Sequence, residues 1–255
     1  MKSIKLIFSD LDRTLLRDDK TLSPYTRQVL AACRERGIKF FPTTARPPRA
    51  LENWIDGLSY DGAVCHNGGV AVLGDKIIWE NGIDPQVTAA LLGELCKNFP
   101  EKKISAEIAG RLYANFDARD IWPGIVYTPS EFDGLPDLPS EKILVEITDP
   151  EDVRAYTALL PAELKLTVSD GTLAMIQPRG IEKGKAVRSI CERLGVSPTD
   201  TVGFGDDLND ISLLLTCGQG VAVENALPQV KAAASALCGS NEEDGPARWL
   251  EEHIL

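Results

Sequence analysis

The chain has 255 residues with ordinary apolar and charged fractions, 44% and 25%, and this length is sufficient for two domains. Its net charge of -11, without runs of Lys or Arg, argues against a nucleic-acid partner, because phosphate backbones bind to basic surfaces. No apolar run has the length of a membrane span, no signal peptide is recognisable, and the six scattered cysteines are typical of a reducing compartment, so a cytoplasmic protein is expected.

The first part of the chain alternates predicted strands and helices. In chain order these are a strand over 4–9, a helix from Ser23-Pro24 to near Gly37, a strand over 38–44, a helix over 51–58, a strand over 62–65 and a hairpin over 70–80 that turns at Gly74-Asp75. Pro42 is unusual in a central strand because it has no N–H to donate. The alternation predicts a parallel sheet with right-handed crossovers.

The middle of the chain changes to an α+β order, which predicts a separate small domain. Its predicted elements are a helix from Asp84-Pro85, strands over 103–110 and 111–116, a loop over 117–140, a strand over 142–147, a helix from Pro150, and strands over 164–169 and 172–177 joined by a turn at Asp170-Gly171. Strand and helix alternate again from Lys183, with a strand over 200–205, a helix over 211–215, a strand over 220–223, a helix from Asn225 and a terminal helix.

Two acidic segments lie at the ends of predicted strands. Asp10 and Asp12 follow the first strand, and the segment 205–210, Gly-Asp-Asp-Leu-Asn-Asp, follows the strand over 200–205. Ligands of open parallel sheets bind beyond the carboxyl ends of the strands, so the two segments are expected to meet at one edge. Each segment alone could equally cap a loop or a helix, and only the combination favours a metal site.

These carboxylates predict both a cation and a reaction. Converging carboxylates repel one another unless a cation is present, and such oxygen ligands suit Mg²⁺, which also binds phosphate. We therefore expect Mg²⁺ on a set of four acidic residues, Asp10, Asp12, Asp206 and Asp210. Asp10 could then attack phosphorus as a covalent nucleophile, while Asp12 protonates the leaving alcohol and later deprotonates the attacking water.

Two further segments could contact a phosphate group. Lys183 begins a predicted helix and is a candidate phosphate clamp, although a surface lysine is the simpler interpretation of that residue alone. Thr44 and the backbone N–H groups that follow it could hold phosphate oxygens, and an ordinary polar turn explains them equally well. A catalytic role of His66 is one interpretation, but a lone His in a loop is more often structural or exposed, and the acidic run 242–244 fits a helix start better than a site.

These residues resemble the motifs of the haloacid dehalogenase-like superfamily, specifically those of its Cof-type phosphatases (subfamily IIB). The resemblance runs from Lys5 to near the C-terminus and is weakest in the middle. It rests on four motifs and on an Asn-Gly pair that often faces the substrate in such proteins: Asp10, Asp12 and Thr14; Thr44 with Arg46; Lys183 with Gly184; Asp206, Asn209 and Asp210; and Asn67 with Gly68. It implies catalytic roles for Asp10, Asp12, Thr44 and Lys183, and substrate binding by Thr14, Arg46, Asn67, Gly68 and Asn209.

The resemblance also implies a fold. It predicts an α/β protein with a Rossmann-like parallel-sheet core over 1–82 and 180–255, and an inserted α+β cap domain over 83–179 that closes over the core and selects the substrate. Two residues depart from the family, since Arg13 and Ala45 stand where Gly is usual. Arg13 is expected to face solvent, and the alternative is that it contacts an anionic substrate or the cap.

The predicted function is a Mg²⁺-dependent phosphatase that hydrolyses small phosphorylated metabolites, sugar phosphates or phosphorylated cofactors, through an aspartyl-phosphate. One alternative is a phosphomutase, which passes the phosphoryl group to a second sugar hydroxyl, and another is a phosphate-ligand binding protein without turnover. The sequence specifies neither the substrate nor the oligomeric state, and it is compatible with a monomer. Arg111, Tyr113, Asn115 and Trp122 in the cap could contact the substrate, although ordinary strand and loop positions explain these residues better.

Overall fold

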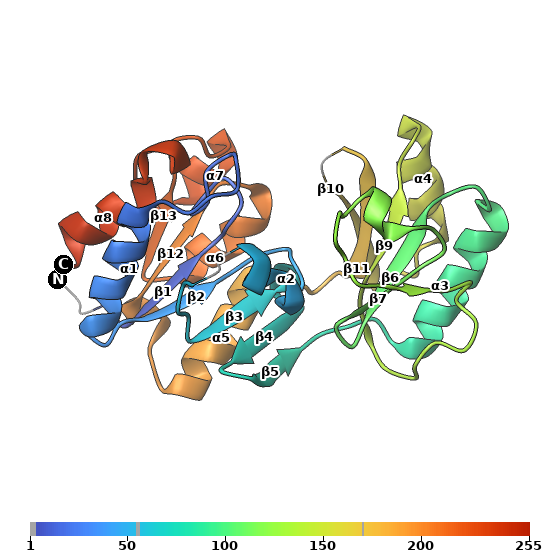
Figure 1. The fold of residues 1–255 in the computed structure, drawn as a ribbon, viewed down its shortest axis with the longest axis horizontal. Coiled ribbons are helices and arrows are strands. Elements are labelled where there is room, and N and C mark those ends of the chain that lie inside the picture. Colours follow the sequence, from blue (N-terminus) through green and yellow to red (C-terminus); the bar gives the residue numbers. More distant parts are fainter. Residues whose placement is uncertain (1–3, 55–56, 170) are drawn as a thin grey trace. The chain divides into compact units, whose positions relative to one another are not determined.

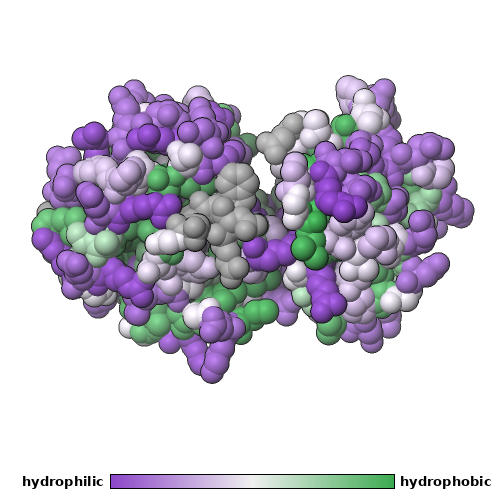
Figure 2. All heavy atoms as spheres, in the orientation of Figure 1, coloured by the Kyte–Doolittle hydropathy of each residue, from purple (hydrophilic) through white to green (hydrophobic). Residues whose placement is uncertain are grey.

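The computed structural model describes residues 4–54, 57–169 and 171–255. It divides into two compact units, one made of Met1–Glu80 with Glu182–Leu255 and the other of Asn81–Ile181. These boundaries lie beside the predicted ones at 82 and 180, while the role of the second unit as a cap stays a prediction. Hydrophilic side chains cover most of the face seen in Figure 2. Among the described helices, none combines the length and the apolar character that crossing a membrane requires.

A five-stranded parallel sheet, in the order β14-β13-β12-β1-β2, forms the centre of the first unit. Its strands are β1 (Leu6–Ser9), β2 (Lys39–Pro42), β12 (Thr201–Gly205), β13 (Gln219–Ala222) and β14 (Ala236–Leu237). The predicted α/β fold with a parallel sheet is confirmed. Pro42 is tolerated because β2 ends this sheet order and the N–H of Thr43, not of Pro42, donates to the carbonyl of Ser9.

Helices cover both faces of this sheet because the side chains of β1 alternate between two apolar clusters. Ile7 belongs to the cluster that includes α1 (Pro24–Glu35) and α8 (Gly245–His253), which lie together at one side of the sheet in Figure 1. Leu6 and Phe8 belong to the cluster that includes α5 (Lys183–Leu194) and α6 (Ile211–Thr216). The remaining helices of four or more residues in this unit are α2 (Pro48–Trp54) and α7 (Pro228–Ala233).

A second, antiparallel sheet of the first unit follows the order β3-β4-β5. Its strands are β3 (Gly62–Cys65), β4 (Val70–Leu73) and β5 (Lys76–Glu80). Leu73 pairs with Lys76 across the turn at Gly74-Asp75, so the predicted hairpin is confirmed. An isolated bridge between Thr43 and Val64 links the end of β2 to β3.

The second unit is built on a six-stranded sheet in the order β10-β11-β9-β6-β7-β8. Its strands are β6 (Ile104–Ile108), β7 (Arg111–Ala114), β8 (Thr128–Pro129), β9 (Ser140–Glu146), β10 (Leu164–Ser169) and β11 (Leu173–Pro178). The helices α3 (Pro85–Asn98) and α4 (Pro150–Leu159) pack against one face of it, where Leu92 and Tyr156 join strand residues such as Ile143 (Figure 1). The predicted α+β order is confirmed, and Asp170 of the predicted turn lies outside the described residues.

Three element predictions need correction or qualification. The helix predicted over 51–58 corresponds to α2, which ends at Trp54, and residues 55–56 lie outside the described part. The helix predicted from Asn225 begins at Pro228 instead, because the side chain of Asn225 bonds to other loops. The short strands β8 and β14 were not predicted, since two residues carry no periodicity.

Candidate active site

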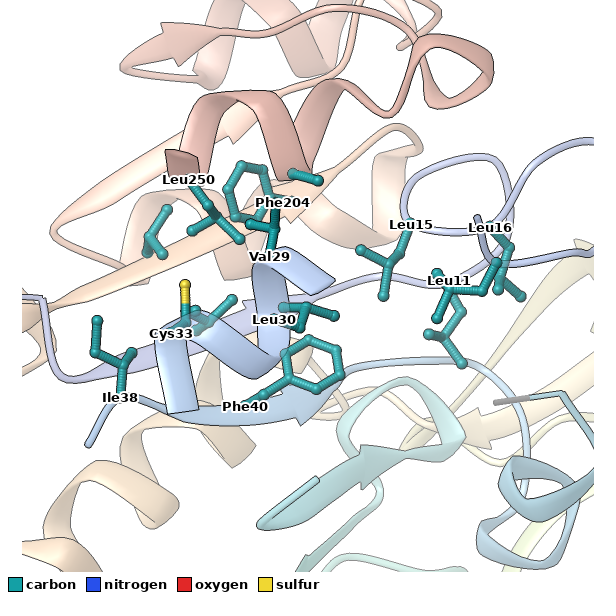
Figure 3. Packing of buried hydrophobic residues seen from close by; sticks show 14 of the residues in the cluster. Leu11, Leu15, Leu16, Val29, Leu30, Cys33, Ile38, Phe40, Phe204 and Leu250 are labelled. Carbon is teal, nitrogen blue, oxygen red and sulfur yellow. The ribbon is translucent and has the colours of Figure 1, made fainter. Parts of the chain in front are cut away.

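The first acidic segment begins where β1 ends. The N–H of Asp10 donates to the carbonyl of Phe204 on β12 at 3.0 Å, so the parallel pairing continues past the strand. The leucines that follow, Leu11, Leu15 and Leu16, are buried in the apolar cluster shown in Figure 3. Because these side chains anchor the loop on the core, the carboxylates on either side of Leu11 occupy defined positions.

The second acidic segment turns sharply after β12 through a short 3₁₀ helix, Leu208–Asp210. Oδ2 of Asp210 accepts hydrogen bonds from the N–H groups of Asp206 (3.0 Å) and Asp207 (3.1 Å), which closes the turn. A Cβ atom at Gly205 would lie 2.4 Å from Cβ of Asp210. Only glycine therefore allows the Asp210 side chain to lie against the end of the strand.

The two segments meet beyond the carboxyl ends of β1 and β12. Asp10, Asp206 and Asp210 each offer a carboxylate oxygen, and these oxygens lie within 4.8 Å of one another. Thr14 joins the segments directly, since its Oγ1 donates to Oδ1 of Asp206 at 2.8 Å across 192 residues of sequence. The parallel-sheet argument thus places three of the four predicted metal ligands together.

Lys183 lies among these carboxylates rather than on the surface. Its side chain is fully buried, and Nζ donates to Oδ1 of Asp10 and to Oδ1 of Asp210, each at 2.6 Å. Gly184 allows α5 to begin here, because a Cβ at that position would lie 2.3 Å from the carbonyl oxygen of Ser212. Burial alone would lower the pKa of Lys183, but the two carboxylates outweigh it and hold the pKa above its ordinary value.

Two carboxylates of this cluster, those of Asp10 and Asp206, have a raised pKa and are harder to ionise than ordinary ones. Burial raises the pKa of Asp10 well above its ordinary value; Lys183 opposes this shift, and the charges of Asp210 and Asp206 add to it. Burial also raises the pKa of Asp206 to about 6, against the hydrogen bond from Thr14 and with further repulsion from Asp210. Buried like charges raise the pKa of carboxyl groups in this way until a cation offsets their repulsion.

The chemistry of this cluster fits a divalent cation. Both oxygens of Asp210 are occupied, by Lys183 and by two backbone N–H groups. Among the described residues, no hydrogen bond reaches Oδ2 of Asp10 or Oδ2 of Asp206, so these two oxygens keep free lone pairs. A hard ion such as Mg²⁺ prefers oxygen ligands of this kind and would offset the excess negative charge.

Asp12 has a different environment from Asp10. Arg46 holds it with a fork, Nε to Oδ2 at 2.8 Å and Nη2 to Oδ1 at 2.5 Å, and Nζ of Lys20 adds a contact to Oδ1 at 2.9 Å. Burial alone would raise the pKa of Asp12, but Arg46 and Lys20 outweigh it and lower the pKa. The Asp12 carboxylate lies outside the group of three described above, so its predicted role as a metal ligand stays a prediction.

The remaining predicted residues lie on two loops joined to the cluster. Oγ1 of Thr44 accepts the N–H of Arg46 at 3.1 Å, and the carbonyl of Thr44 accepts the N–H of Asn67 at 3.0 Å. Nδ2 of Asn209 donates to Oδ1 of Asn67 at 2.9 Å. Gly68 has φ of +97°, and a Cβ there would lie 2.3 Å from the carbonyl oxygen preceding Lys183, so the loop packs closely on the start of α5.

The sequence reasoning missed Lys20 and did not explain Arg13. Lys20 lies in an exposed turn, and the only sequence signal is its place in a run of polar turn residues, 17–21. Arg13 has φ of 62°, in the left-handed region that glycine adopts without strain, which explains why Gly is usual at this position. Its side chain is 59% exposed, with Nε at 3.9 Å from Oδ1 of Asp18, so it faces solvent as expected.

Two of the candidate substrate contacts in the second unit have structural partners instead. Tyr113 packs against the helix-side cluster of the sheet. The side chain of Asn115 donates to the carbonyl of Lys102 (3.1 Å) and accepts the N–H of Ile104 (2.8 Å), which holds two strand ends together. Trp122 packs on a smaller cluster with Leu112, and substrate contact by this residue or by Arg111 stays a prediction.

Fold and site together define a parallel-sheet α/β enzyme whose acidic site lies at the carboxyl edge of the sheet. Within that class, the chain belongs to the haloacid dehalogenase-like hydrolases, because the model of this family matches residues 7–250. The matched range contains every motif residue on which the predicted resemblance rests. The resemblance and the predicted hydrolase class are thereby confirmed.

Relatives of similar length align with nearly the whole of this chain, at low sequence identity. A Haemophilus influenzae protein named only as a phosphatase, without a substrate, is 28% identical over 265 residues, 97% of both chains. A Bacillus subtilis 5-amino-6-(5-phospho-D-ribitylamino)uracil phosphatase is 26% identical over 266 residues, 98% of this chain and 97% of the relative. A haloacid dehalogenase-like hydrolase from Bacteroides thetaiotaomicron has the same fold, with a TM-score of 0.87, 24% identity and coverage of 98% and 99%.

Proposed function

We propose that this protein is a Mg²⁺-dependent phosphatase that hydrolyses small phosphorylated metabolites through an aspartyl-phosphate on Asp10. The observation that carries the proposal is the convergence of Lys183, Asp206 and Asp210 on the Asp10 carboxylate. A buried cluster with more carboxylates than cations lowers the stability of the fold, so its presence favours a functional role for the cluster. The relatives described above are named as phosphatases, which supports the same reaction.

Asp10 is the proposed nucleophile. Lys183 holds its Oδ1 and orients the carboxylate, so that one oxygen attacks phosphorus while the other contacts the metal. The attack forms a P–O bond on Asp10 and breaks the ester P–O bond, and the leaving oxygen takes a proton from Asp12. When bound to Asp10 and Asp206, with Asp210 beside them, Mg²⁺ would supply the positive charge that offsets repulsion between the nucleophile and the phosphate oxygens.

Asp12 then acts as the base of the second half-reaction. Its carboxylate takes a proton from water, the water oxygen bonds to phosphorus, and the P–O bond to Asp10 breaks to release inorganic phosphate. Arg46 and Lys20 lower the pKa of Asp12, so this group is present as the carboxylate that can accept the proton. The acid role in the first half-reaction requires a proton that arrives with the substrate.

The proposed substrate class is a phosphate monoester of a small polyhydroxylated molecule. One relative is named for a phosphate on a ribitylamino chain, and one structure of the same fold (24% identity, TM-score 0.82, covering 98% of this chain and all of the other) is described as a subclass IIB sugar phosphatase. The chain as a whole carries -11, so the site must supply its own positive charge for such an anion. We propose that Thr44, with the loop residues Asn67, Gly68 and Asn209 and with Thr14 and Arg46, binds its phosphate or its hydroxyl groups.

The direct test is phosphate release from p-nitrophenyl phosphate and from a panel of sugar and polyol phosphates, with Mg²⁺ or with EDTA. We expect Mg²⁺-dependent release that Asp10→Asn lowers by a factor of about 10⁴ or more, the scale of other nucleophile deletions. Asp207→Asn is the matched control, because Asp207 is an exposed neighbour that caps a helix turn and Asn preserves the cap. Release that survives Asp10→Asn unchanged would contradict the proposal.

The same panel separates the alternatives. An isomerised sugar phosphate without free phosphate would instead identify a phosphomutase. Saturable binding of a phosphorylated metabolite without any turnover would identify a binding protein that has lost activity.

A further inference from the structure

Lys20 makes an ion pair with Asp12 that lies next to the proposed reaction. Its Nζ is 2.9 Å from Oδ1 of Asp12, and the same oxygen accepts Nη2 of Arg46 at 2.5 Å. Oδ2 of Asp12 accepts one hydrogen bond from the described residues, from Nε of Arg46. The two oxygens are therefore unequal, since Oδ1 has two cationic donors and Oδ2 has one.

A tight turn delivers Lys20 to this position. The N–H of Arg17 donates to the carbonyl of Thr21 at 3.0 Å, and the N–H of Lys20 donates to the carbonyl of Arg17 at 2.9 Å. Oδ1 of Asp19 accepts both the N–H and the hydroxyl of Thr21. Lys20 has φ of 67°, a left-handed conformation that a non-glycine residue adopts only where its surroundings impose it.

Residues 241–244, near the C-terminus, hold this turn in place through hydrogen bonds and an ion pair. The N–H of Asp18 donates to Oε1 of Glu242 at 2.7 Å, and Oδ1 of Asp18 accepts Nδ2 of the buried Asn241 at 3.1 Å. Arg17 forms an ion pair with Asp244 at 3.2 Å. The run 242–244, which the sequence suggested was only a helix start, thus anchors the turn that carries Lys20.

We propose that Lys20 is a positioning residue for Asp12, an inference that rests on the function proposed above. An ordinary surface lysine pair contributes little because both side chains move freely. Here the lysine backbone is held by a closed turn whose first residues, Arg17 and Asp18, are anchored by side chains near the C-terminus, and its partner is the proposed acid/base. By occupying Oδ1 together with Arg46, Lys20 leaves Oδ2 as the oxygen that exchanges the proton with the leaving group and with water.

Leaving-group dependence tests this assignment. Phenyl phosphate and p-nitrophenyl phosphate have similar shapes, but phenolate needs a proton from the enzyme far more than p-nitrophenolate does. We expect Lys20→Met to lower kcat/KM for phenyl phosphate about 10- to 100-fold, which is a part of the full value of acid–base catalysis. The kcat/KM for p-nitrophenyl phosphate should fall less than about 3-fold. Lys20→Arg keeps a cationic donor and should restore most of the phenyl phosphate activity.

Lys5→Met is the matched control, since Lys5 pairs with Asp200 at 3.1 Å near the opposite end of β1, and it should leave both substrates unaffected. Equal losses on both esters in Lys20→Met would overturn the assignment and indicate substrate binding or general destabilisation. No loss on either ester, or no rescue by Lys20→Arg, would overturn it as well. Wild-type protein without Mg²⁺-dependent turnover of either ester would overturn the proposed function itself, and the inference with it.

Discussion

Two carboxylates on either side of one leucine occupy opposite electrostatic surroundings. The site floor, defined as Asp10, Lys183, Asp206 and Asp210, holds three buried carboxylates and one ammonium group. The site rim, defined as Asp12, Lys20 and Arg46, holds one carboxylate and two cations. The pKa of Asp206 is raised to about 6 in the floor, whereas the pKa of Asp12 is lowered in the rim.

We infer from this contrast how a strongly acidic chain could bind the proposed anionic substrate. The floor keeps an excess of negative charge that a divalent cation would offset, and the rim keeps an excess of positive charge beside it. A phosphate monoester would need both regions. The floor with its cation would bind the transferred phosphoryl group, and the rim would surround Asp12, the proposed acid/base. The variants of Asp12, Lys183 and Asp206 described below each remove one member of the rim or the floor, so that the two regions can be compared by their effects.

Asp12→Asn is expected to have the largest effect in the rim. Without the acid/base, kcat/KM for phenyl phosphate should fall about 10²- to 10⁴-fold, the usual range for acid–base catalysis, and kcat/KM for p-nitrophenyl phosphate less than about 10-fold. Steady-state kinetics with both esters measures the difference. A loss of the same size on both esters would show that Asp12 does not protonate the leaving group.

Lys183→Met tests whether the floor depends on its single cation. The variant leaves Asp10 and Asp210 buried side by side without a counter-ion, which should lower the free energy of unfolding by about 3–5 kcal/mol. Urea unfolding in EDTA measures this cost without metal binding. For comparison, Lys5→Met removes an exposed ion pair and should cost less than about 1 kcal/mol, and equal costs for the two variants would contradict the assignment.

The floor should make Mg²⁺ binding depend on pH. The pKa of Asp206 in the folded protein, about 6, exceeds its ordinary value of 3.8, so this carboxyl stabilises the metal-free fold while protonated. That stabilisation is complete below pH 3.8 and is lost as the pH rises through about 6. Above this range Asp206 is ionised and can accept the cation, so Mg²⁺ should stabilise the protein more at pH 7.5 than at pH 5.

Thermal unfolding at the two pH values measures this difference. Mg²⁺ at 100 times its Kd stabilises a protein by about 2.7 kcal/mol, which corresponds to roughly 5–10 °C in Tm for a chain of this size. Asp206→Asn should remove the shift at pH 7.5. An equal shift at both pH values would argue that Asp206 is not a ligand.

Arg13→Gly is expected to have the smallest effect. Relief of the left-handed backbone strain, about 1 kcal/mol, is offset by the larger freedom of glycine in the unfolded chain, so the free energy of unfolding should change by less than about 0.5 kcal/mol. Phosphatase kinetics should stay within about 2-fold of wild type. A selective loss on anionic metabolites, with p-nitrophenyl phosphate unaffected, would instead place Arg13 in contact with the substrate.

The meeting of the floor's carboxylates could be predicted from the sequence because it depends on topology. β1 and β12 are parallel neighbours, with Leu6 opposite Thr201, so the residues that follow them must lie close together. The acidic pattern then indicated which side chains meet. Lys183 could be placed there only by resemblance, since nothing in its local sequence distinguishes it from a surface lysine.

The rim could not be predicted in the same way because it depends on backbone details of loops. Lys20 reaches Asp12 only through a turn with a left-handed residue, held by residues more than 220 positions away in the chain. Similarly, the start of α7 was misplaced because Asn225 was assigned to a helix, whereas its side chain bonds to Arg13 and Asn241. Pro228 at the first position of α7 was the sequence signal for the correct start.

The central place of β1 has a consequence for synthesis on the ribosome. The proposed nucleophile, Asp10, follows β1, which pairs with the much later strand β12, and the turn at 17–21 is anchored by residues 241–244. A nascent chain therefore carries this aspartate without its partners until β12 and residues 241–244 have been synthesised. A product that ends before Asn241 would lack the anchor of this turn, and one that ends at β12 would also lack Asp206 and Asp210.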